Sequence, residues 1–495
     1  MESRGRSSVA ARDGREKRGN GSRASGRRST AARGRGARAN GVRGAATADV
    51  AAVQVVPIYK RLPHGPHRLG RSEVVLHQRA RIHGAMVEAV AESGYQNTSV
   101  KRVVGLAGVS RRSFYEQFAN KEDCFFATFD LIVRRQVKQI RKAYLAAGGS
   151  LEQRAGAIFQ GLAQFSTEDR NASVLVVLEA QRAGVNGVLR LRNAIGACEQ
   201  ALAHSFAESR GAAVLPAPLV RAIAGGLHGI VAASLHEHAA DSVGLAQEML
   251  DWTMPFQAPG AEHTAERMAA VLKARLREIS STYGHGLSGA EAPSRDERTR
   301  LLQGVLRLAS REDFRKLSAP QIADEANVSI DGFCNMFEDK DDCFLAALDM
   351  IGDELLAIAA DPDLVSSDWP HAVRRVLAQL TRHLADHPLH ARTLAHEAFF
   401  AGTDAVERNI ELAHSIATLL TEGAPVEADA SLITDAVAGA IWHTIRCQVV
   451  SGRIPLLAAL SDHLAYVVLA PFIGTEAALA TVASDACDPR ALQST

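Results

Sequence analysis

Two adjacent arginines, Arg111 and Arg112, follow Ser110 in what the sequence predicts as the first turn of a short helix. Ser110 is a favourable N-cap, because its hydroxyl can accept a hydrogen bond from the main chain of that turn. Cations there oppose the helix dipole at a cost of about 0.3–1 kcal/mol each, which an anionic partner would offset. At the start of a helix in the major groove, arginine can bind guanine through two hydrogen bonds. The pair therefore indicates contact with double-stranded DNA, and spacing alone leaves open an ordinary helical hairpin with a solvated basic edge.

Four more polar side chains lie at helix starts or on the same predicted helix. Tyr115 lies one turn after Arg111, and its hydroxyl can reach a phosphate. Lys121, at the start of the next predicted helix, can bind a second phosphate. Thr98 and Ser99, at the start of the preceding helix, can do the same.

Four successive helices are predicted to position these residues, because apolar residues recur at helical spacing and strand-like alternation is absent. The fold class is therefore all-α. The first helix ends at Gly94, the third covers residues 110–118, and the fourth begins near Asn120. Between the second and third helices, Gly108 can adopt the positive φ that a tight turn often needs. Helices two and three thus form a helix-turn-helix.

Three sequence segments together resemble the DNA-binding domain of the tetracycline-repressor (TetR) family, and their flanks resemble its actinobacterial type. The segments are Gly94-Tyr95-x-x-Thr98-Ser99-Val100, Ala107-Gly108-Val109-Ser110 and Phe114-Tyr115-x-x-Phe118-x-x-Lys121-Glu122. The resemblance implies base contacts from Arg111, Arg112 and Ser113, and phosphate contacts from Thr98, Tyr115 and Lys121. It also implies a larger helical domain that binds a small effector and dimerises.

The chain repeats four landmarks in the same order. The segment that begins Val109-Ser110 recurs 219 residues later as Val328-Ser329. Three more pairs recur at offsets of 214 to 218, namely Glu179 and Glu397, Ala222–Gly225 and Ala436–Gly439, and Pro255-Phe256 and Pro471-Phe472. We therefore predict two tandem units, each a three-helix helix-turn-helix domain followed by a helical-bundle regulatory domain.

The second unit departs from the first at the DNA-contacting positions. Ile330, Asp331, Gly332 and Cys334 occupy the positions that match Arg111, Arg112, Ser113 and Tyr115. The packing residues Val328, Phe333 and Phe337 are kept, and so is Lys340. We predict a degenerate helix-turn-helix that keeps the fold and does not bind DNA selectively.

The predicted domain boundaries follow from the repeat and from composition. They are a disordered Arg/Gly/Ala-rich basic tail over 1–70, a helix-turn-helix domain over 71–130, a helical regulatory domain over 131–258, a linker over 259–294, a degenerate helix-turn-helix domain over 295–350, and a helical regulatory and dimerisation domain over 351–486.

Net charge separates the tail from the rest of the chain. Residues 1–48 contain 13 basic and three acidic residues, so they carry +10 of a whole-chain charge of +1. Such a segment has too few large apolar side chains to form a core, so we expect disorder. Four interpretations stay open: a non-specific DNA-binding arm, an organelle transit peptide, a solvated tail, or an over-extended reading frame whose true start lies downstream.

Several chemical classes are not indicated by the sequence. Six cysteines are scattered without a C-x-x-C pair, which is typical of a reducing cytoplasm and argues against a disulfide scaffold or a zinc finger. The sequence has no phosphate-binding glycine loop and no catalytic triad, so we predict no enzyme, catalytic residue or cofactor. We also predict no metal site, because Pro388 interrupts the helix face that His383, His387 and His390 could share. Pro471 interrupts the longest apolar stretch, so we predict no membrane span.

The predicted function is a sequence-specific DNA-binding transcriptional regulator, located in the cytoplasm and associated with the nucleoid. Its partners would be double-stranded DNA and an unidentified small apolar or amphipathic effector that releases a repressor, where repression and effector control follow from the resemblance. The alternatives are an effector-binding or protein-interaction module with vestigial DNA binding, and a tail-driven non-specific DNA binder.

Small residues mark a predicted interface between helices. Residues 222–225 and 436–439 place small side chains on one helix face, which allows close approach. We predict an intrachain pseudo-dimer of the two units through these helices. A homodimer of the whole chain, or ordinary packing within each domain, remains the alternative.

Overall fold

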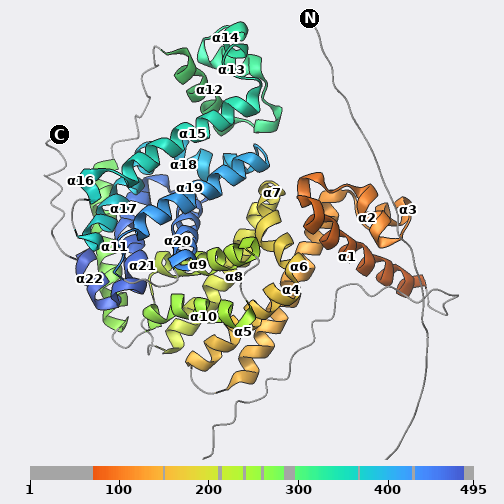
Figure 1. The fold of residues 1–495 in the computed structure, drawn as a ribbon, viewed down its shortest axis with the longest axis horizontal. Coiled ribbons are helices and arrows are strands. Elements are labelled where there is room, and N and C mark those ends of the chain that lie inside the picture. The colour runs from red at the N-terminus through yellow and green to blue at the C-terminus, as the bar shows by residue number, and fades with distance from the viewer. Residues whose placement is uncertain are drawn as a thin grey trace, which may run out of the picture. The chain divides into compact units, whose positions relative to one another are not determined.

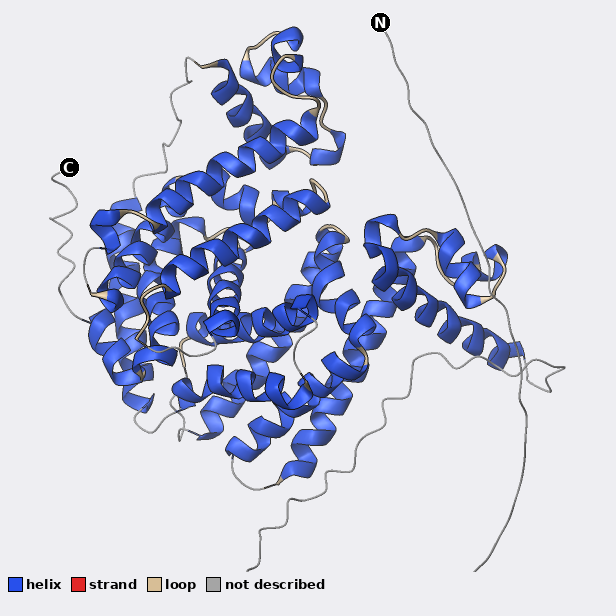
Figure 2. Ribbon diagram, in the orientation of Figure 1, coloured by secondary structure: helices blue, strands red, loops and turns tan. Residues whose placement is uncertain are grey.

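The computed structural model describes residues 71–148, 151–209, 215–237, 241–257, 261–283, 296–365, 368–425 and 430–483. Within these ranges the chain consists of helices joined by turns and contains no β-strand (Figure 2). The predicted all-α class is therefore confirmed. The basic tail predicted over 1–70 lies outside the described residues.

The first helix-turn-helix region, which we call the first head, comprises three helices and the start of a fourth (Figure 1). These are α1 (Arg71–Asn97), α2 (Val100–Ala107), α3 (Arg111–Tyr115) and α4 (Lys121–Ala147). The helical backbone of α1 breaks at Gly94, whose φ is 73°, as the sequence predicts. Gly108 takes the predicted positive φ of 60° at the end of α2. The third helix ends at Tyr115, so it is shorter than predicted.

Side-chain caps fix where these helices begin. The hydroxyls of Ser99 and Ser110 accept hydrogen bonds from the main-chain N–H groups of Arg102 and Ser113. Such caps satisfy N–H groups that the first turn of a helix leaves without partners. Beneath them the fully buried rings of Phe114, Phe118 and Phe125 pack with Ile82 and Met86 of α1.

A helical bundle follows the first head. It contains α5 (Leu151–Glu168), α6 (Arg170–Val174), the π-helical turn η1 (Leu175–Glu179), α7 (Ala180–Arg182), α8 (Val185–Ser209), α9 (Ala217–Glu237), α10 (Ser242–Thr253) and the 3-10 turn η2 (Met254–Gln257).

A long helix occupies most of the stretch that the sequence predicts as a linker. Helix α11 (Ala261–Tyr283) packs on the C-terminal helices through the buried Met268, and Arg275 Nε donates to Asp462 Oδ2 at 2.9 Å. The linker predicted over 259–294 is therefore corrected to a shorter segment after Tyr283, which lies largely outside the described residues. The polar composition of the stretch reflects the solvent-facing side of this helix, which hides its periodicity.

The rest of the chain begins with a second head, made of α12 (Glu297–Arg311), the 3-10 turn η3 (Phe314–Lys316), α13 (Ala319–Ala326), α14 (Ile330–Cys334) and the start of α15 (Lys340–Ala359). The bundle that follows contains α16 (Pro362–Val365), α17 (Trp369–Asp386), α18 (Pro388–Ala395), the 3-10 turn η4 (Glu397–Phe399), α19 (Thr403–Thr421), α20 (Ala430–Val450), the 3-10 turn η5 (Ile454–Leu460), α21 (Ser461–Ile473) and α22 (Thr475–Ala483).

Helices α9 and α20 form the most extensive contact between the two bundles, and Figure 1 shows them side by side. A Cβ atom on Gly225 would lie 2.6 Å from the carbonyl oxygen of Gly439, and a Cβ on Gly439 would clash with Gly225 in the same way. Only glycine permits a backbone approach this close. The small residues singled out in the sequence therefore do face one another.

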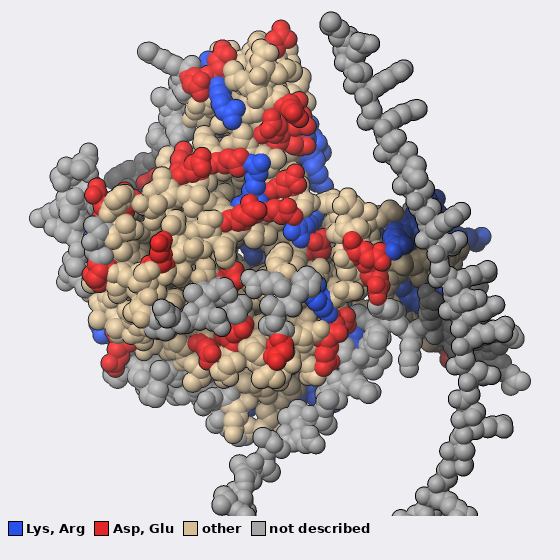
Figure 3. Space-filling model, viewed as in Figure 1, with Lys and Arg blue, Asp and Glu red and all other residues tan. Residues whose placement is uncertain are grey.

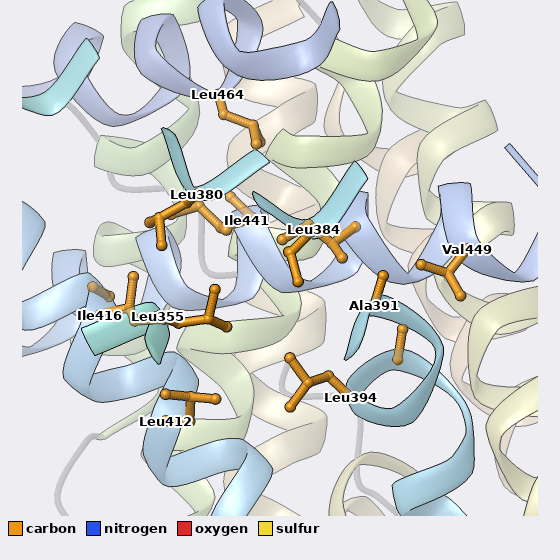
Figure 4. Close-up of a cluster of buried hydrophobic side chains, with 14 of the residues drawn as sticks. Leu355, Leu380, Leu384, Ala391, Leu394, Leu412, Ile416, Ile441, Val449 and Leu464 are labelled. Carbon is orange, nitrogen blue, oxygen red and sulfur yellow. The ribbon is translucent and has the colours of Figure 1, made fainter. Parts of the chain in front are cut away.

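A group of large aliphatic side chains fills the centre of the second bundle, as Figure 4 shows. Leu355, Leu380, Leu384, Ile416 and Ile441 come from α15, α17, α19 and α20 and line a cavity of about 20 Å³. That volume is about enough for one water molecule, so this core is closed.

Two helical stretches, Ala217–His236 and Ile454–Ile473, are long and apolar enough to cross a membrane by length and composition alone. Their windows are 67% and 72% buried against other helices, and this burial accounts for their apolar composition. Pro471 lies inside α21, which continues past the proline to Ile473 and has Gly474 as its C-cap.

Candidate nucleic-acid interface

The two arginines of α3 are exposed on the surface of the first head. Arg111 forms no hydrogen bond or ion pair within the described part of the chain. The side chain of Arg112 is 89% exposed, and its Nε donates to Glu116 Oε1 at 3.0 Å. An exposed i,i+4 pair of this kind contributes only a few tenths of a kcal/mol, so a phosphate or a base can replace the carboxylate.

Basic side chains gather where α2 and α3 lie, as Figure 3 shows at the edge of the first head. On α2, Lys101 and Arg102 are exposed in the first turn, just as Arg111 and Arg112 are on α3. Arg102 Nε donates to Glu92 Oε2 at 3.1 Å across the head. Neither Lys101 nor Arg102 was predicted as a contact from the sequence, although the same signal, a capping serine followed by adjacent cations, was present.

Ser99, Ser110 and Ser113 lie on the predicted contact surface, and their hydroxyls already form hydrogen bonds at the starts of α2 and α3. Ser99 and Ser110 are exposed N-caps. The hydroxyl oxygens of Ser110 and Ser113 lie 2.9 Å apart. A hydroxyl has one hydrogen to donate, so Ser99 can donate to a DNA acceptor while it caps. Of Ser110 and Ser113, the one that accepts in their mutual contact can do so too.

Tyr115 presents its side chain to solvent, with 56% of the residue exposed. Its ring packs edge-to-face on the buried ring of Phe114, with centroids 5.3 Å apart. The contact fixes the ring, and the hydroxyl is left to solvent as a phosphate contact requires.

Thr98 has a different position from the one that the sequence predicts. Only 3% of the residue is exposed, and its hydroxyl donates to the carbonyl oxygens of Gly94 at 2.8 Å and Ala89 at 3.1 Å. A hydroxyl held in this way cannot reach a phosphate. Thr98 therefore closes the broken end of α1, and its hydroxyl is not presented at the surface.

The side chain of Lys121 also forms hydrogen bonds within the head. Its Nζ donates to the carbonyl oxygens of Tyr95 at 2.9 Å and Gln96 at 3.3 Å, and lies 4.2 Å from the centre of the Tyr95 ring. Burial lowers the pKa of this ammonium from its usual value. Lys121 therefore joins the start of α4 to the end of α1, and its partly exposed ammonium uses two of its three donors inside the head.

The second head repeats this internal arrangement residue by residue. Lys340 Nζ donates to the carbonyl oxygens of Phe314 at 2.9 Å and Arg315 at 3.2 Å, and it lies 4.8 Å from the centre of the Phe314 ring. Ser329 caps α14 as Ser110 caps α3, and Asn327 takes the positive φ of 52° that Gly108 takes in the first head.

The outer face of the second head differs. Ile330 is 42% exposed at the position of Arg111, and Asp331 follows it in the first turn of α14. At Gly332 a Cβ would lie 2.8 Å from Val328 Cγ1, so a side chain there would need the neighbouring valine to shift. Figure 3 shows acidic side chains on this head, which a phosphate backbone would repel.

A buried carboxylate links the first head to the bundle behind it. Glu179, at the end of the π-helical turn and 6% exposed, accepts a hydrogen bond from the main-chain N–H of Tyr95 at 2.7 Å. Its other oxygen accepts from Arg182 at 2.7 Å, and Arg182 also donates to Glu407 at 3.1 Å. The sequence singled out Glu179 only as a repeat landmark, since nothing local indicates a partner 84 residues away.

Comparison with known proteins is consistent with this geometry. Residues 84–128, which cover most of the first head, match the family model described as "Bacterial regulatory proteins, tetR family". The match supports a DNA-binding transcription regulator. No curated protein matches the chain.

Two solved structures align with part of the chain. One is the fatty acid degradation regulator FadR from Bacillus halodurans, at 20% identity and a TM-score of 0.32, over 34% of this chain and 94% of that one. The other is the transcriptional regulator FadR from Bacillus subtilis in complex with stearoyl-CoA, at 19% identity and a TM-score of 0.32, over 34% of this chain and 95% of that one.

Proposed function

We propose that the protein is a sequence-specific transcriptional regulator that contacts DNA through its first head. The match of residues 84–128 to the tetR family model supports this function. Arg111 and Arg112 would contact bases, together with Ser113. Ser99, Ser110 and Tyr115 would contact phosphates, with Lys101 and Arg102 of α2 beside them. The observation that carries the proposal is the exposed guanidinium of Arg111, which has no partner within the described residues. Arg111 is the first residue of α3, where a positive charge opposes the helix dipole and lowers stability.

The second head, in this proposal, does not recognise a DNA sequence. Its core, caps and internal lysine match those of the first head, which supports two tandem copies of one unit. Its outer face carries Ile330 and Asp331 in place of two arginines. An apolar side chain and a carboxylate offer no donor to guanine, and the carboxylate repels phosphate. A chain with this arrangement has one DNA-recognising head.

The two copies would pair within one chain as a pseudo-dimer. Gly225 and Gly439 occupy equivalent positions in the repeat and contact each other. In a two-fold arrangement, residues that meet their own equivalents lie near the axis, so this contact supports an approximate two-fold axis between α9 and α20. Phe256 of the first copy packs on Tyr466 of the second at 6.0 Å between centroids, which extends the same interface.

Control by an effector would act through the link between the first head and its bundle. Glu179 holds the broken end of α1 through Tyr95, and Arg182 joins the same carboxylate to Glu407 of the second bundle. If the turn η1 can adopt two conformations, a ligand that binds one of them more tightly would shift the orientation of the head. Release of a repressor is the form of control that we propose.

The test is selective binding by the full chain. Fragments selected from random duplex DNA should yield a preferred sequence, and that duplex should bind at least about 1000-fold more tightly than a scrambled one. If affinity were the same for both duplexes and fell steeply with salt, the basic tail would account for binding. If neither duplex bound, the rival function, an effector or protein-interaction module with a vestigial head, would be supported.

A further inference from the structure

Three side chains that could bind a metal ion converge in the second bundle. Glu354 lies on α15, His383 on α17 and His390 on α18, and their ligand atoms all lie within 4.8 Å of one another. The break at Pro388 brings them together. Helix α17 ends at Asp386 and α18 begins at Pro388, so the chain turns and His390 returns toward His383.

The spacing of the three ligand atoms suits a small divalent ion. One carboxylate oxygen, Glu354 Oε2, lies 3.3 Å from His383 Nε2 and 3.3 Å from His390 Nδ1. Ligands bound tetrahedrally at about 2.0–2.1 Å from zinc lie about 3.3–3.4 Å apart, so both separations match an edge of that polyhedron. His390 Nδ1 is buried and has no hydrogen-bond partner, so its contact with Glu354 is not an ordinary hydrogen bond.

Burial and stacking hold the histidine rings in place. His390 is 6% exposed, so its ring lies in the interior of the bundle. The Glu354 side chain is 41% exposed, which leaves a route from solvent. His387 stacks on both rings, with centroids 4.4 Å from His383 and 5.1 Å from His390, and holds them in place.

We do not propose a metal site at a second group of potential ligands, Glu199, His443 and Cys447. His443 Nε2 and Glu199 Oε1 lie 2.8 Å apart, which is a satisfied hydrogen bond. Arg221 lies 3.8 Å from the same carboxylate group and would repel a cation. A proton already occupies the position that a metal would take.

We propose that Glu354, His383 and His390 bind one divalent transition-metal ion of the zinc class, with water completing its coordination. Two imidazoles and one carboxylate are the donor types that such ions take in proteins. The bound ion joins α15 to both sides of the α17–α18 break. Arg392 of α18, two residues after His390, donates to the carbonyl oxygen of Ser310 near the end of α12 at 2.9 Å. The ion therefore braces the part of the bundle on which the second head rests, and this role does not depend on the proposed DNA binding.

The experiment titrates Zn²⁺ into the metal-free full-length protein by calorimetry. We expect one equivalent to bind, and we expect His383→Gln and His390→Gln each to weaken that binding about 100-fold or more. The matched control is His371→Gln, which removes a partly exposed histidine of α17 that pairs with Asp368 outside the cluster, and it should leave binding unchanged. Equal affinity in the wild type and in both ligand variants overturns the proposal. So does a loss in the control as large as in the ligand variants.

Two further measurements keep the test decisive if a buried histidine variant fails to fold. Glu354→Gln alters a partly exposed side chain, so it should fold, bind Zn²⁺ much more weakly and lose the rise in Tm that Zn²⁺ gives the wild type. Co²⁺, used as a visible probe in the same site, should show the absorption of a low-coordinate ion in the wild type and not in Glu354→Gln. A Tm rise or a Co²⁺ spectrum that is unchanged in Glu354→Gln contradicts the site.

Discussion

Lys121 and Lys340 make the same contacts inside the two heads. Each ammonium donates to two carbonyl oxygens that lie just before the second helix of its head, and it lies over an aromatic ring. The repeat kept the lysine because the fold of each head needs it. Arg111 and Arg112, which no internal contact requires, were free to differ in the second copy.

Replacement of either lysine should therefore lower stability by a similar amount, but the two replacements should differ in their effect on DNA affinity. We expect Lys121→Ala and Lys340→Ala each to lower the free energy of unfolding by roughly 1 kcal/mol, because partly buried carbonyls lose their donor. Only Lys121→Ala should also weaken binding to the selected duplex. Urea denaturation and duplex titration of both variants measure the two effects. Equal loss of DNA affinity in both variants would show that the second head contributes to binding.

At the scale of elements, the link between the π-helical turn η1 and the end of α1 decides how the first head is held. Glu179 accepts from Tyr95 N–H, and in the second bundle Glu397 instead pairs with Arg392 at 3.0 Å. The first head is thus tied to its bundle through its own backbone at the glycine break in α1.

Glu179→Gln tests this link. The neutral amide accepts more weakly and loses the ion pair with Arg182, so the main-chain amide of Tyr95 should exchange its hydrogen faster. Affinity for the selected duplex should fall, because the orientation of the head is less fixed. Glu397→Gln is the matched control and should lower stability while leaving affinity unchanged. Unaltered exchange at Tyr95 in Glu179→Gln would mean that the carboxylate does not hold the head.

The α9–α20 contact gives a second prediction for the elements. Gly225→Ala should destabilise the protein by about 1–3 kcal/mol, because its methyl group would meet the backbone of α20. Gly156→Ala is the control: this glycine lies inside α5 with open space where a Cβ would be, so alanine there should stabilise by about 0.5–1 kcal/mol. Thermal denaturation compares the two, and a neutral Gly225→Ala would argue against close pairing of the helices.

The helices of both heads could be predicted from local signals, and the contacts between distant elements could not. Capping serines, a glycine turn and spaced phenylalanines each act within a few residues, so Ser110, Gly108 and Phe114 took the predicted places. Thr98 and Lys121 did not, because either side chain can face DNA or the head, and carbonyl oxygens at the broken end of α1 accept from both of them. The convergence of His383 and His390 depends on a helix break whose direction no local pattern specifies.

For the whole molecule, buried neutral histidines make stability depend on pH. Burial, with Arg79 and Arg134 nearby, lowers the pKa of His83 to about 4, and burial lowers that of His463 to about 4. In the unfolded chain both would titrate near 6.5. The stability that their neutral forms provide is complete above about pH 6.5 and is lost as the pH falls toward 4, by about 1.4 kcal/mol per pH unit for each group within that window.

Thermal denaturation between pH 7 and pH 4 tests this dependence. Tm should fall with pH, and His83→Gln should make the fall shallower. His77, an exposed histidine of α1, provides the control, since His77→Gln should leave the slope as it is in the wild type. A Tm that stays constant between pH 6.5 and pH 4 would exclude the account.

The central claim is that one of two similarly built heads recognises DNA. The most direct measurement is the affinity of the full chain for its selected duplex with either outer face altered. We predict that Arg111→Ala with Arg112→Ala reduces the preference for the selected over the scrambled duplex by about 100-fold or more, because each arginine–base pairing contributes about 1–3 kcal/mol of discrimination. The exposed Arg141→Ala of α4 and the paired change Ile330→Ala with Asp331→Ala should leave that preference unchanged. Full preference in the double arginine variant, or its loss in the second-head variant, would contradict the account.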